Sequence, residues 1–320
     1  MTPSSSNTTS PTSPTSVFVA GLRFRNPIVL ASGTAGYGRE IEDVVDLTAI
    51  GAIATKAVSV EPRHGAKPLR VSEFAGGMIN AIGLANPGLN EVRAEALPWL
   101  ARSYPDTRVI VNVVGYSVED FETVVGGVDG ERGVDAFELN VSCPNVKAGG
   151  TEFGADPAAL AALVRATRLR TARPLFVKLS PALGAGIVDA ARVAIDNGAD
   201  GLTLVNTMPG LVIDTDRRKP KIGFGTGGVS GPALLPFGLL ATWRVSQALP
   251  NVPIIGLGGV STYDDALQYI MAGASLVGVG TAALRDPRAP ERIARELDTW
   301  CREHAVTDLR TLQGTLEWPL

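Results

Sequence analysis

The sequence predicts a (β/α)8 TIM barrel, and three observations lead to this fold class. Short runs rich in apolar and β-branched residues recur eight times along the chain. Each run is hydrophobic nearly throughout, as strands buried on both faces are. Stretches with helical periodicity separate the runs, among them DPAALAALVRATRLR and TYDDALQYIMAGA. Eight alternations of strand and helix in a chain of this length are typical of the barrel.

The predicted elements follow in chain order. VFVAGLRFRN reads as an N-terminal β-hairpin, which we expect to plug the bottom of the barrel. The eight strands are IVLAS from residue 28, AIATKAV from 52, VIVNVVG from 109, AFELNVS from 136, LFVKLS from 175, GLTLVN from 201, PIIGLGG from 253 and LVGVGT from 276. Two connections, residues 59–108 and 207–252, are too long to be simple helices. Long connections in compact domains are usually functional, so we expect these βα-loop insertions to serve the site.

Composition limits the domain organisation and the function classes. A chain of 320 residues with 45% hydrophobic content can bury a large core, so we expect one domain over residues 17–320. Residues 1–16 are rich in Ser, Thr and Pro and are predicted to be a disordered tail. No apolar run approaches the roughly 20 residues of a membrane span. The net charge of −3, without a basic block, argues against nucleic acid as a partner.

Cysteine and histidine usage predicts a reduced, cytoplasmic protein without a metal site. The two cysteines, Cys143 and Cys301, are too few for an iron–sulfur cluster or a zinc ribbon. The two histidines, His64 and His304, have no metal-ligand spacing.

Polar residues and glycines gather where the predicted strands end, which is the rim that carries the chemistry of this fold. They are Ser32, Gly33, Lys56, Asn112, Asn140, Lys178, Asn206, Gly258, Gly259, Gly280 and Thr281. A lysine within a buried strand is costly unless it is paired, so we expect each of the two lysines to meet an anion. The turns GLGGVS and GVGT, with the helix N-termini that follow them, predict a phosphate-binding cradle.

Several segments resemble a dihydroorotate dehydrogenase. They occur in order over residues 25–285, and they read NPIVLASG, KAVSVEPRHG, NAIGLANPG, ELNVSCPNVKAGG, VKLSP, ADGLTLVNT, GGVSGPALLP, GLGGV and AGASLVGVGT. Cys143 in place of serine, the VKAGG that follows it, and the lack of an N-terminal membrane-binding helix resemble the NAD-dependent class 1B catalytic subunit. The chain departs from the family at Leu235, where relatives often have lysine, and in the run at residues 222–225. We expect these departures to affect loop packing or partner contact.

The resemblance implies an FMN enzyme of de novo pyrimidine biosynthesis that oxidises (S)-dihydroorotate to orotate. It also implies a partner subunit with FAD and a [2Fe–2S] cluster that passes electrons to NAD, in a heterotetramer of two catalytic and two partner subunits. By resemblance, the FMN-binding residues are Ser32, Lys56, Ala57, Asn112, Asn140, Lys178, Val205, Gly231, Gly258, Gly259, Gly280 and Thr281. The substrate-binding residues are Lys56, Asn80, Ala81, Ile82, Gly83, Leu84, Asn140, Asn206 and Thr207.

Cys143 matches the catalytic base of the family, and its sequence context agrees with that role. A free cysteine is usually a small buried hydrophobe. Cys143, however, follows a strand end and precedes Pro144, on a loop with Gly149 and Gly150 that could open and close over a substrate. The reference pKa of a thiol is about 8.5, so the hypothesis of a thiolate base predicts a rate that rises with pH. We interpret Lys147 as a solvated loop charge and Cys301 as inert packing.

Three other functions stay open from the sequence. A class 1A enzyme would reduce fumarate without a partner subunit. A related flavin enzyme would act on another dihydropyrimidine. A phosphate-binding barrel without redox chemistry would have the same fold, because barrels support many functions.

Overall fold

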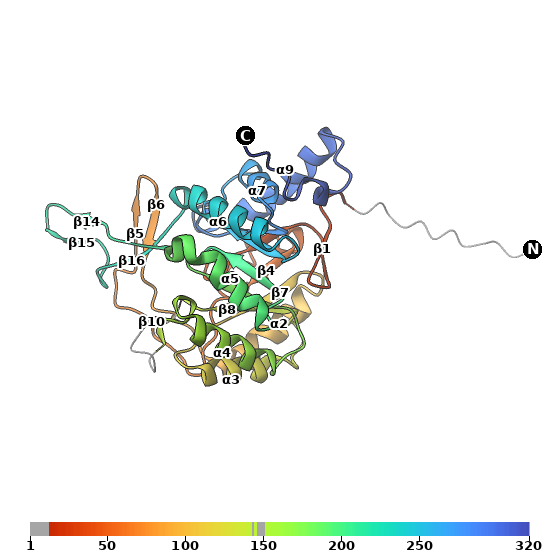
Figure 1. Ribbon diagram of the computed structural model, residues 1–320. Coiled ribbons are helices and arrows are strands. Elements are labelled where there is room, and N and C mark those ends of the chain that lie inside the picture. The colour runs from red at the N-terminus through yellow and green to blue at the C-terminus, as the bar shows by residue number, and fades with distance from the viewer. Residues whose placement is uncertain (1–12, 143, 146–150, 320) are drawn as a thin grey trace, which may run out of the picture.

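The computed structural model of the protein describes residues 13–142, 144–145 and 151–319. Eight parallel strands close into a barrel, as the sequence predicts, with helices packed around it (Figure 1). In barrel order they are β3 (Ile28–Leu30), β4 (Ala52–Ala54), β7 (Arg108–Val113), β8 (Ala136–Asn140), β11 (Leu175–Leu179), β12 (Gly201–Leu204), β17 (Ile254–Leu257) and β18 (Leu276–Val279). All eight coincide with predicted runs.

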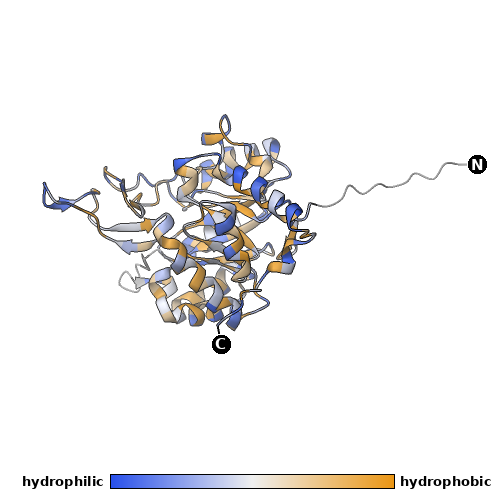
Figure 2. Cartoon of the chain, turned by 90° about the horizontal axis from the view of Figure 1, so that it is seen from above, coloured by the Kyte–Doolittle hydropathy of each residue, from blue (hydrophilic) through white to orange (hydrophobic). Residues whose placement is uncertain are grey.

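Two apolar layers explain why the strands are hydrophobic on both faces. Residues that point outward from the strands form one large cluster with the inner faces of the helices. Residues that point inward form a second cluster, which includes Ile110, Ala136 and Phe176. Figure 2 shows the hydrophobic residues concentrated in the central strands. Burial of both faces favours continuous β-branched and aliphatic sequence over alternation.

The N-terminal hairpin closes the lower end of the barrel, which confirms its predicted place. It consists of β1 (Val17–Val19) and β2 (Leu22–Phe24), joined by a tight turn. Val17, Val19 and Phe24 are buried within the inward-facing cluster, next to the residues that begin the barrel strands. The plug therefore leaves only the carboxyl ends of the strands open.

The helices follow the strands as the periodicity predicts. They are α1 (Leu89–Glu91), α2 (Leu97–Ser103), α3 (Val118–Val128), α4 (Pro157–Arg168), α5 (Ile187–Asp196), α6 (Leu235–Ala248), α7 (Tyr263–Met271), α8 (Thr281–Arg285) and α9 (Ala289–Glu303). A π-helical turn, Val92–Ala96, joins α1 to α2. Short 3-10 turns are Arg39–Ile41, Leu47–Ala49, Phe153–Ala155, Pro181–Gly186, Pro232–Leu234 and Leu309–Leu312.

The two long connections form one antiparallel sheet beside the barrel mouth. The first contributes β5 (Val71–Phe74) and β6 (Gly77–Asn80), and the second contributes β13 (Met208–Gly210) and β16 (Gly227–Ser230). Their order is β13, β16, β6, β5, so segments far apart in the sequence pair directly. A projecting hairpin, β14 (Ile213–Asp214) and β15 (Lys219–Pro220), extends from the second connection (Figure 1). A further short pair, β9 (Pro144–Asn145) and β10 (Thr151–Glu152), follows β8.

Residues 13–16, within the predicted tail, make specific contacts. The hydroxyl of Ser13 donates to Asp298 on α9 at 2.6 Å, and the carbonyl of Pro14 accepts from the backbone N–H of Leu309 at 2.9 Å. Thr15 is buried. Ser13 and Pro14 therefore contact the C-terminal part of the chain, and the hydroxyl of Ser16 donates to the carbonyl of Phe24 on β2. Among the described residues, no helix has the length and apolar character to cross a membrane.

Candidate active site at the barrel mouth

A cavity of about 700 Å³ lies at the carboxyl ends of the barrel strands. Every predicted FMN-binding and substrate-binding residue lines it, from Ser32 after β3 to Thr281 after β18. The predicted base, Cys143, lies outside the described residues, as do Lys147, Gly149 and Gly150 of the loop after it. The cavity therefore unites residues from all eight strand ends and from both long connections.

The lysine of β11 meets an anion, as its burial requires. The ammonium of Lys178 lies 3.6 Å from the carboxylate of Glu138 and donates to the hydroxyl of Ser32 at 3.3 Å. Lys178 is 5% exposed, so the pair is shielded from water. The prediction of an anionic partner is thus confirmed for Lys178. Lys56 is half-buried at the cavity wall, and among the described residues its ammonium forms no ion pair.

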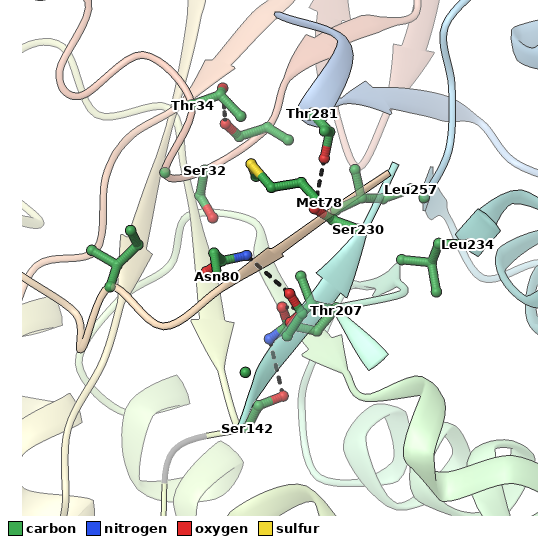
Figure 3. A pocket seen from close by; sticks show the side chains of 18 of the residues that line it. Ser32, Thr34, Met78, Asn80, Ser142, Thr207, Ser230, Leu234, Leu257 and Thr281 are labelled. Carbon is green, nitrogen blue, oxygen red and sulfur yellow. Dashed lines mark hydrogen bonds between the residues drawn. The ribbon is translucent and has the colours of Figure 1, made fainter. Parts of the chain in front are cut away.

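Asparagine and serine side chains form a linked group on one side of the cavity. The amide nitrogen of Asn206 donates to Asn140 at 3.1 Å and to Ser142 at 3.0 Å, while its oxygen accepts from the backbone N–H of Thr207. Asn80, on β6, donates to the carbonyl of Gly228 on β16 at 3.2 Å. Figure 3 shows Asn80, Ser142 and Thr207 around the same part of the cavity. Asn206 is therefore hydrogen-bonded at both ends of its amide, whereas the Asn80 oxygen accepts no hydrogen bond from the described residues.

The glycine turns after β17 and β18 border the other side of the cavity. Gly259 has a φ of +77°, and a Cβ there would lie 2.6 Å from the backbone nitrogen of Leu235, so the turn requires glycine. The hydroxyl of Tyr269 donates to the carbonyl of Gly258 at 2.8 Å from within the core. Burial raises the pKa of Tyr269, which keeps the phenol protonated as a donor.

At the start of α7, the chain itself supplies a carboxylate to the N-terminus that the predicted phosphate cradle includes. Thr262 and Asp265 form a capping box at the start of α7, and the Asp265 carboxylate accepts from the backbone N–H groups of Ser261 and Thr262. A carboxylate thus already occupies the N-terminus of α7. The part of the cradle that fits an anion consists of the Gly258–Gly259 turn and the Gly280–Thr281 turn.

The Tyr269→Phe variant is expected to weaken phosphate binding without changing the fold. Loss of the hydroxyl leaves the buried Gly258 carbonyl without its donor, which costs about 1–3 kcal/mol. We expect a lower melting temperature and a several-fold rise in the Kd for the phosphorylated cofactor, measured by fluorescence titration. The control is Tyr263→Phe, on the same helix, because the hydroxyl that donates to the Gly258 carbonyl belongs to Tyr269, and this control should leave the Kd unchanged. Equal Kd values for the wild type and Tyr269→Phe would contradict the role.

The structure adds cavity residues that the site prediction from the sequence lacked. They include Thr34, Met78, Ser142, Glu152, Ser230 and Leu234. Ser230 and Thr281 share a hydrogen bond of 2.7 Å across the cavity wall (Figure 3). Burial raises the pKa of Glu152, which lies just after the loop that follows β8. The alternation of the strand that ends in Asn140 could have indicated Ser142, since both point to the same side.

The fold and the site together define a (β/α)8-barrel enzyme with its chemistry at the carboxyl ends of the strands. The family model of dihydroorotate dehydrogenase matches residues 15–300. The chain belongs to the dihydroorotate dehydrogenase family.

Curated relatives indicate which type of dihydroorotate dehydrogenase the chain is similar to. Two are named dihydroorotate dehydrogenase B (NAD(+)), catalytic subunit: one from Pelobacter propionicus, 47% identical over 301 residues, and one from Geobacter sp. strain M21, 44% identical over 302 residues. Both matches cover 94% of this chain and 98% of the relative. A relative from Solibacter usitatus, 46% identical over 300 residues, covers 94% of this chain and 97% of its own, and is provisionally named a dihydroorotate dehydrogenase A (fumarate).

The fold has a counterpart among solved structures. A crystal structure of DHODH in complex with ferulenol from Eimeria tenella superposes with a TM-score of 0.79 at 23% sequence identity. The match covers 97% of this chain and 90% of that one. At this level of identity the comparison confirms the barrel fold.

Proposed function

We propose that this protein oxidises (S)-dihydroorotate to orotate in pyrimidine biosynthesis, as the catalytic subunit of an NAD-dependent dihydroorotate dehydrogenase. The observation that carries the proposal is the convergence of every predicted binding residue on one cavity. The identity of 44–47% to class B catalytic subunits over 94% of the chain supports the assignment.

The residues of the cavity fit an FMN group. The Oδ1 atom of Asn112 is buried without a hydrogen-bond partner among the described residues, and it belongs to a residue that lines the cavity. A buried acceptor of this kind calls for a donor, and the flavin ring offers an N–H group. Lys178 supplies a cation, and the glycine turns supply backbone N–H groups for a phosphate. Leu84, Val205 and Leu257 add apolar walls for a flat ring.

The reaction separates into a proton transfer and a hydride transfer. Dihydroorotate loses a proton from C5 and a hydride from C6, and the C5–C6 bond becomes a double bond. FMN supplies the two-electron acceptor, which no protein side chain can replace. Lys178 holds a positive charge at the cavity wall, where it would stabilise negative charge that develops during the reaction. Lys56 and the backbone of residues 80–84 would bind the carboxylate of the substrate, and Asn80 and Asn206 would bind the ring amides.

We propose Cys143 as the general base that takes the C5 proton. The chain on both sides of its loop supports this assignment, since Ser142 and Glu152 both line the cavity. Ser142 is held by Asn206, so the strand end that leads into Cys143 is anchored to the substrate side of the cavity. A thiolate within reach of C5 could accept the proton directly.

We also propose that electrons leave through a partner subunit with FAD and a [2Fe–2S] cluster, which reduces NAD. The two cysteines of this chain are too few for a cluster, and the described residues contain no group of metal-ligand side chains. A heterotetramer of two catalytic and two partner subunits, in the cytoplasm, is the assembly that the resemblance implies. Residues 17–320 would form its single FMN-binding domain.

Anaerobic spectroscopy tests the proposal directly. We expect the purified protein to be yellow, and we expect dihydroorotate to bleach its flavin absorbance within the dead time of manual mixing. Steady NAD reduction should require the partner polypeptide. A colourless protein that binds a phosphorylated ligand would instead favour a non-redox barrel. Rapid fumarate reduction by the chain alone would favour class 1A. This class is the second candidate because the relative from Solibacter usitatus has a name of that type.

A further inference from the structure

Glu138 is a buried acid in the barrel interior that the proposed mechanism does not use. It is 3% exposed and lies on β8, two residues before Asn140, so both side chains point into the barrel. Its neighbours in register are Asn112 on β7 and Phe176 on β11. Glu138 does not line the cavity, yet it lies directly behind residues that do.

Three side chains from three other strands contact the Glu138 carboxylate. Asn112 donates to Oε1 at 2.6 Å, and the Lys178 ammonium lies 3.6 Å from the same oxygen. Thr203, on β12, donates to Oε2 at 2.7 Å. Asn112 and Lys178 both line the cavity, so the carboxylate touches two cavity residues at once.

The contact with Asn112 fixes which end of its amide faces the ligand. A carboxylate only accepts hydrogen bonds, so the amide nitrogen of Asn112 must point toward Glu138. The amide oxygen then points away from Glu138, and it is the buried atom without a partner among the described residues. Glu138 thereby determines that Asn112 offers an acceptor to the cavity and not a donor.

The Glu138 carboxylate also balances the positive charge of Lys178, which lines the cavity that would hold the ligand. Water cannot screen this pair, because Lys178 is 5% and Glu138 3% exposed. A negative charge close to a redox group opposes the addition of electrons, while a positive charge favours it. The pair therefore sets the electrostatic environment of a group bound at Lys178.

A purely structural role explains these contacts less well. A buried ion pair is weak evidence for stability, since apolar residues of similar volume are often equally stabilising. The layer below is apolar, with Ile110, Ala136 and Phe176, as barrel interiors usually are. Among the described residues, Asn112, Glu138, Lys178 and Thr203 form a polar group between this apolar layer and the cavity, which Asn112 and Lys178 line.

We propose that Glu138 is a positioning residue for the redox reaction. Its carboxylate orients the Asn112 amide so that an oxygen accepts an N–H of FMN, and it sets the reduction potential by balancing the charge of Lys178. This inference rests on the proposed function, because the ligand is FMN.

The test compares full-length wild type with Glu138→Gln. Glutamine keeps the size of the side chain, but it removes the charge and can donate to Asn112, which allows the Asn112 amide to turn. We expect the Kd of the apoprotein for FMN to rise about tenfold, which corresponds to the loss of one good hydrogen bond. We expect the midpoint potential of bound FMN to shift to a more positive value. Fluorescence titration and anaerobic dye equilibration measure the two quantities.

Two further variants separate positioning from stability. Thr203→Val removes one hydrogen bond to Glu138 but keeps its charge and its contact with Asn112. It should lower the melting temperature and leave the potential unchanged. Glu138→Asp keeps the charge but withdraws it from Asn112, so it should weaken FMN binding with a smaller shift in potential. Glu138→Asp provides the decisive measurement if Glu138→Gln fails to fold.

The outcomes distinguish a failure of the proposed function from a failure of the positioning role of Glu138. A wild-type protein that binds no FMN would refute the proposed function itself. FMN binding by the wild type, with unchanged Kd and potential in the Glu138 variants, would refute the positioning role alone. A shift in potential in Thr203→Val as large as that in Glu138→Gln would also overturn the role, because the effect would then not depend on the charge.

Discussion

The Cys143→Ala variant is expected to lose turnover of dihydroorotate while it keeps bound FMN. Alanine cannot accept the C5 proton, and loss of a general base typically lowers the rate about 10²- to 10⁴-fold. The FMN-binding residues at the strand ends are unchanged, so the flavin absorbance of the purified variant should match that of the wild type. Anaerobic stopped-flow mixing with dihydroorotate measures the rate of flavin bleaching.

The pH profile and the second cysteine provide the controls. The base works in its deprotonated form, so the wild-type rate should rise with pH and level off above the pKa of Cys143, which starts from a reference of about 8.5. Cys301 is buried in α9, and desolvation with the nearby Asp298 raises its pKa to about 11. Cys301→Ala should keep both the rate and the profile. Normal bleaching by Cys143→Ala would show that another group removes the proton.

The Lys178→Ala variant is expected to bind FMN poorly and to reduce it slowly. Lys178 supplies a buried positive charge at the cavity, and a hydrogen bond to a charged group contributes about 1.5–3 kcal/mol. The Kd for FMN should therefore rise about ten- to hundredfold. The variant also leaves Glu138 buried without its cation, which destabilises the fold by about 3–5 kcal/mol. Fluorescence titration of the apoprotein and thermal unfolding measure the two effects.

A double variant separates binding from stability. Lys178→Ala combined with Glu138→Gln removes the uncompensated charge, so it should recover part of the stability without recovering FMN affinity. Lys219→Ala is the matched control, since Lys219 is an exposed lysine on β15 outside the cavity. It should change neither quantity. If Lys178→Ala keeps both the wild-type Kd and the wild-type reduction rate, Lys178 has no role at the flavin.

The sequence predicted the barrel well because burial on both faces leaves a clear signal. Runs such as VIVNVVG and LFVKLS are hydrophobic throughout, and each corresponds to a strand with an apolar layer on either side. The strand ends were also predicted from the sequence, because a lysine or asparagine at the end of such a run is costly to bury in the apolar core and fits best at the barrel mouth. All the predicted binding residues accordingly line one cavity.

Periodicity also contained information that the prediction did not use. Asn140 points into the barrel, so Glu138, two residues earlier on the same strand, points inward as well. Thr203 lies beside Lys178 on the next strand, so its side chain points to the same side as that of Lys178. Applying this alternation below the rim would have indicated a polar layer behind the cavity. The capping box at Thr262 and Asp265 could also have been predicted from the sequence, because Thr and Asp stand three residues apart at the start of a helical stretch.

The sequence alone determined the strand order, the plug hairpin and the residues of the barrel mouth, because each depends on local pattern and on a fold with fixed connectivity. Only the tertiary structure decided that the two long connections share a sheet, in which Asn80 pairs with Gly228. It also decided which partner each buried polar group has. Such pairings join residues far apart in the chain, and their free energy depends on distance and desolvation, which no local pattern records.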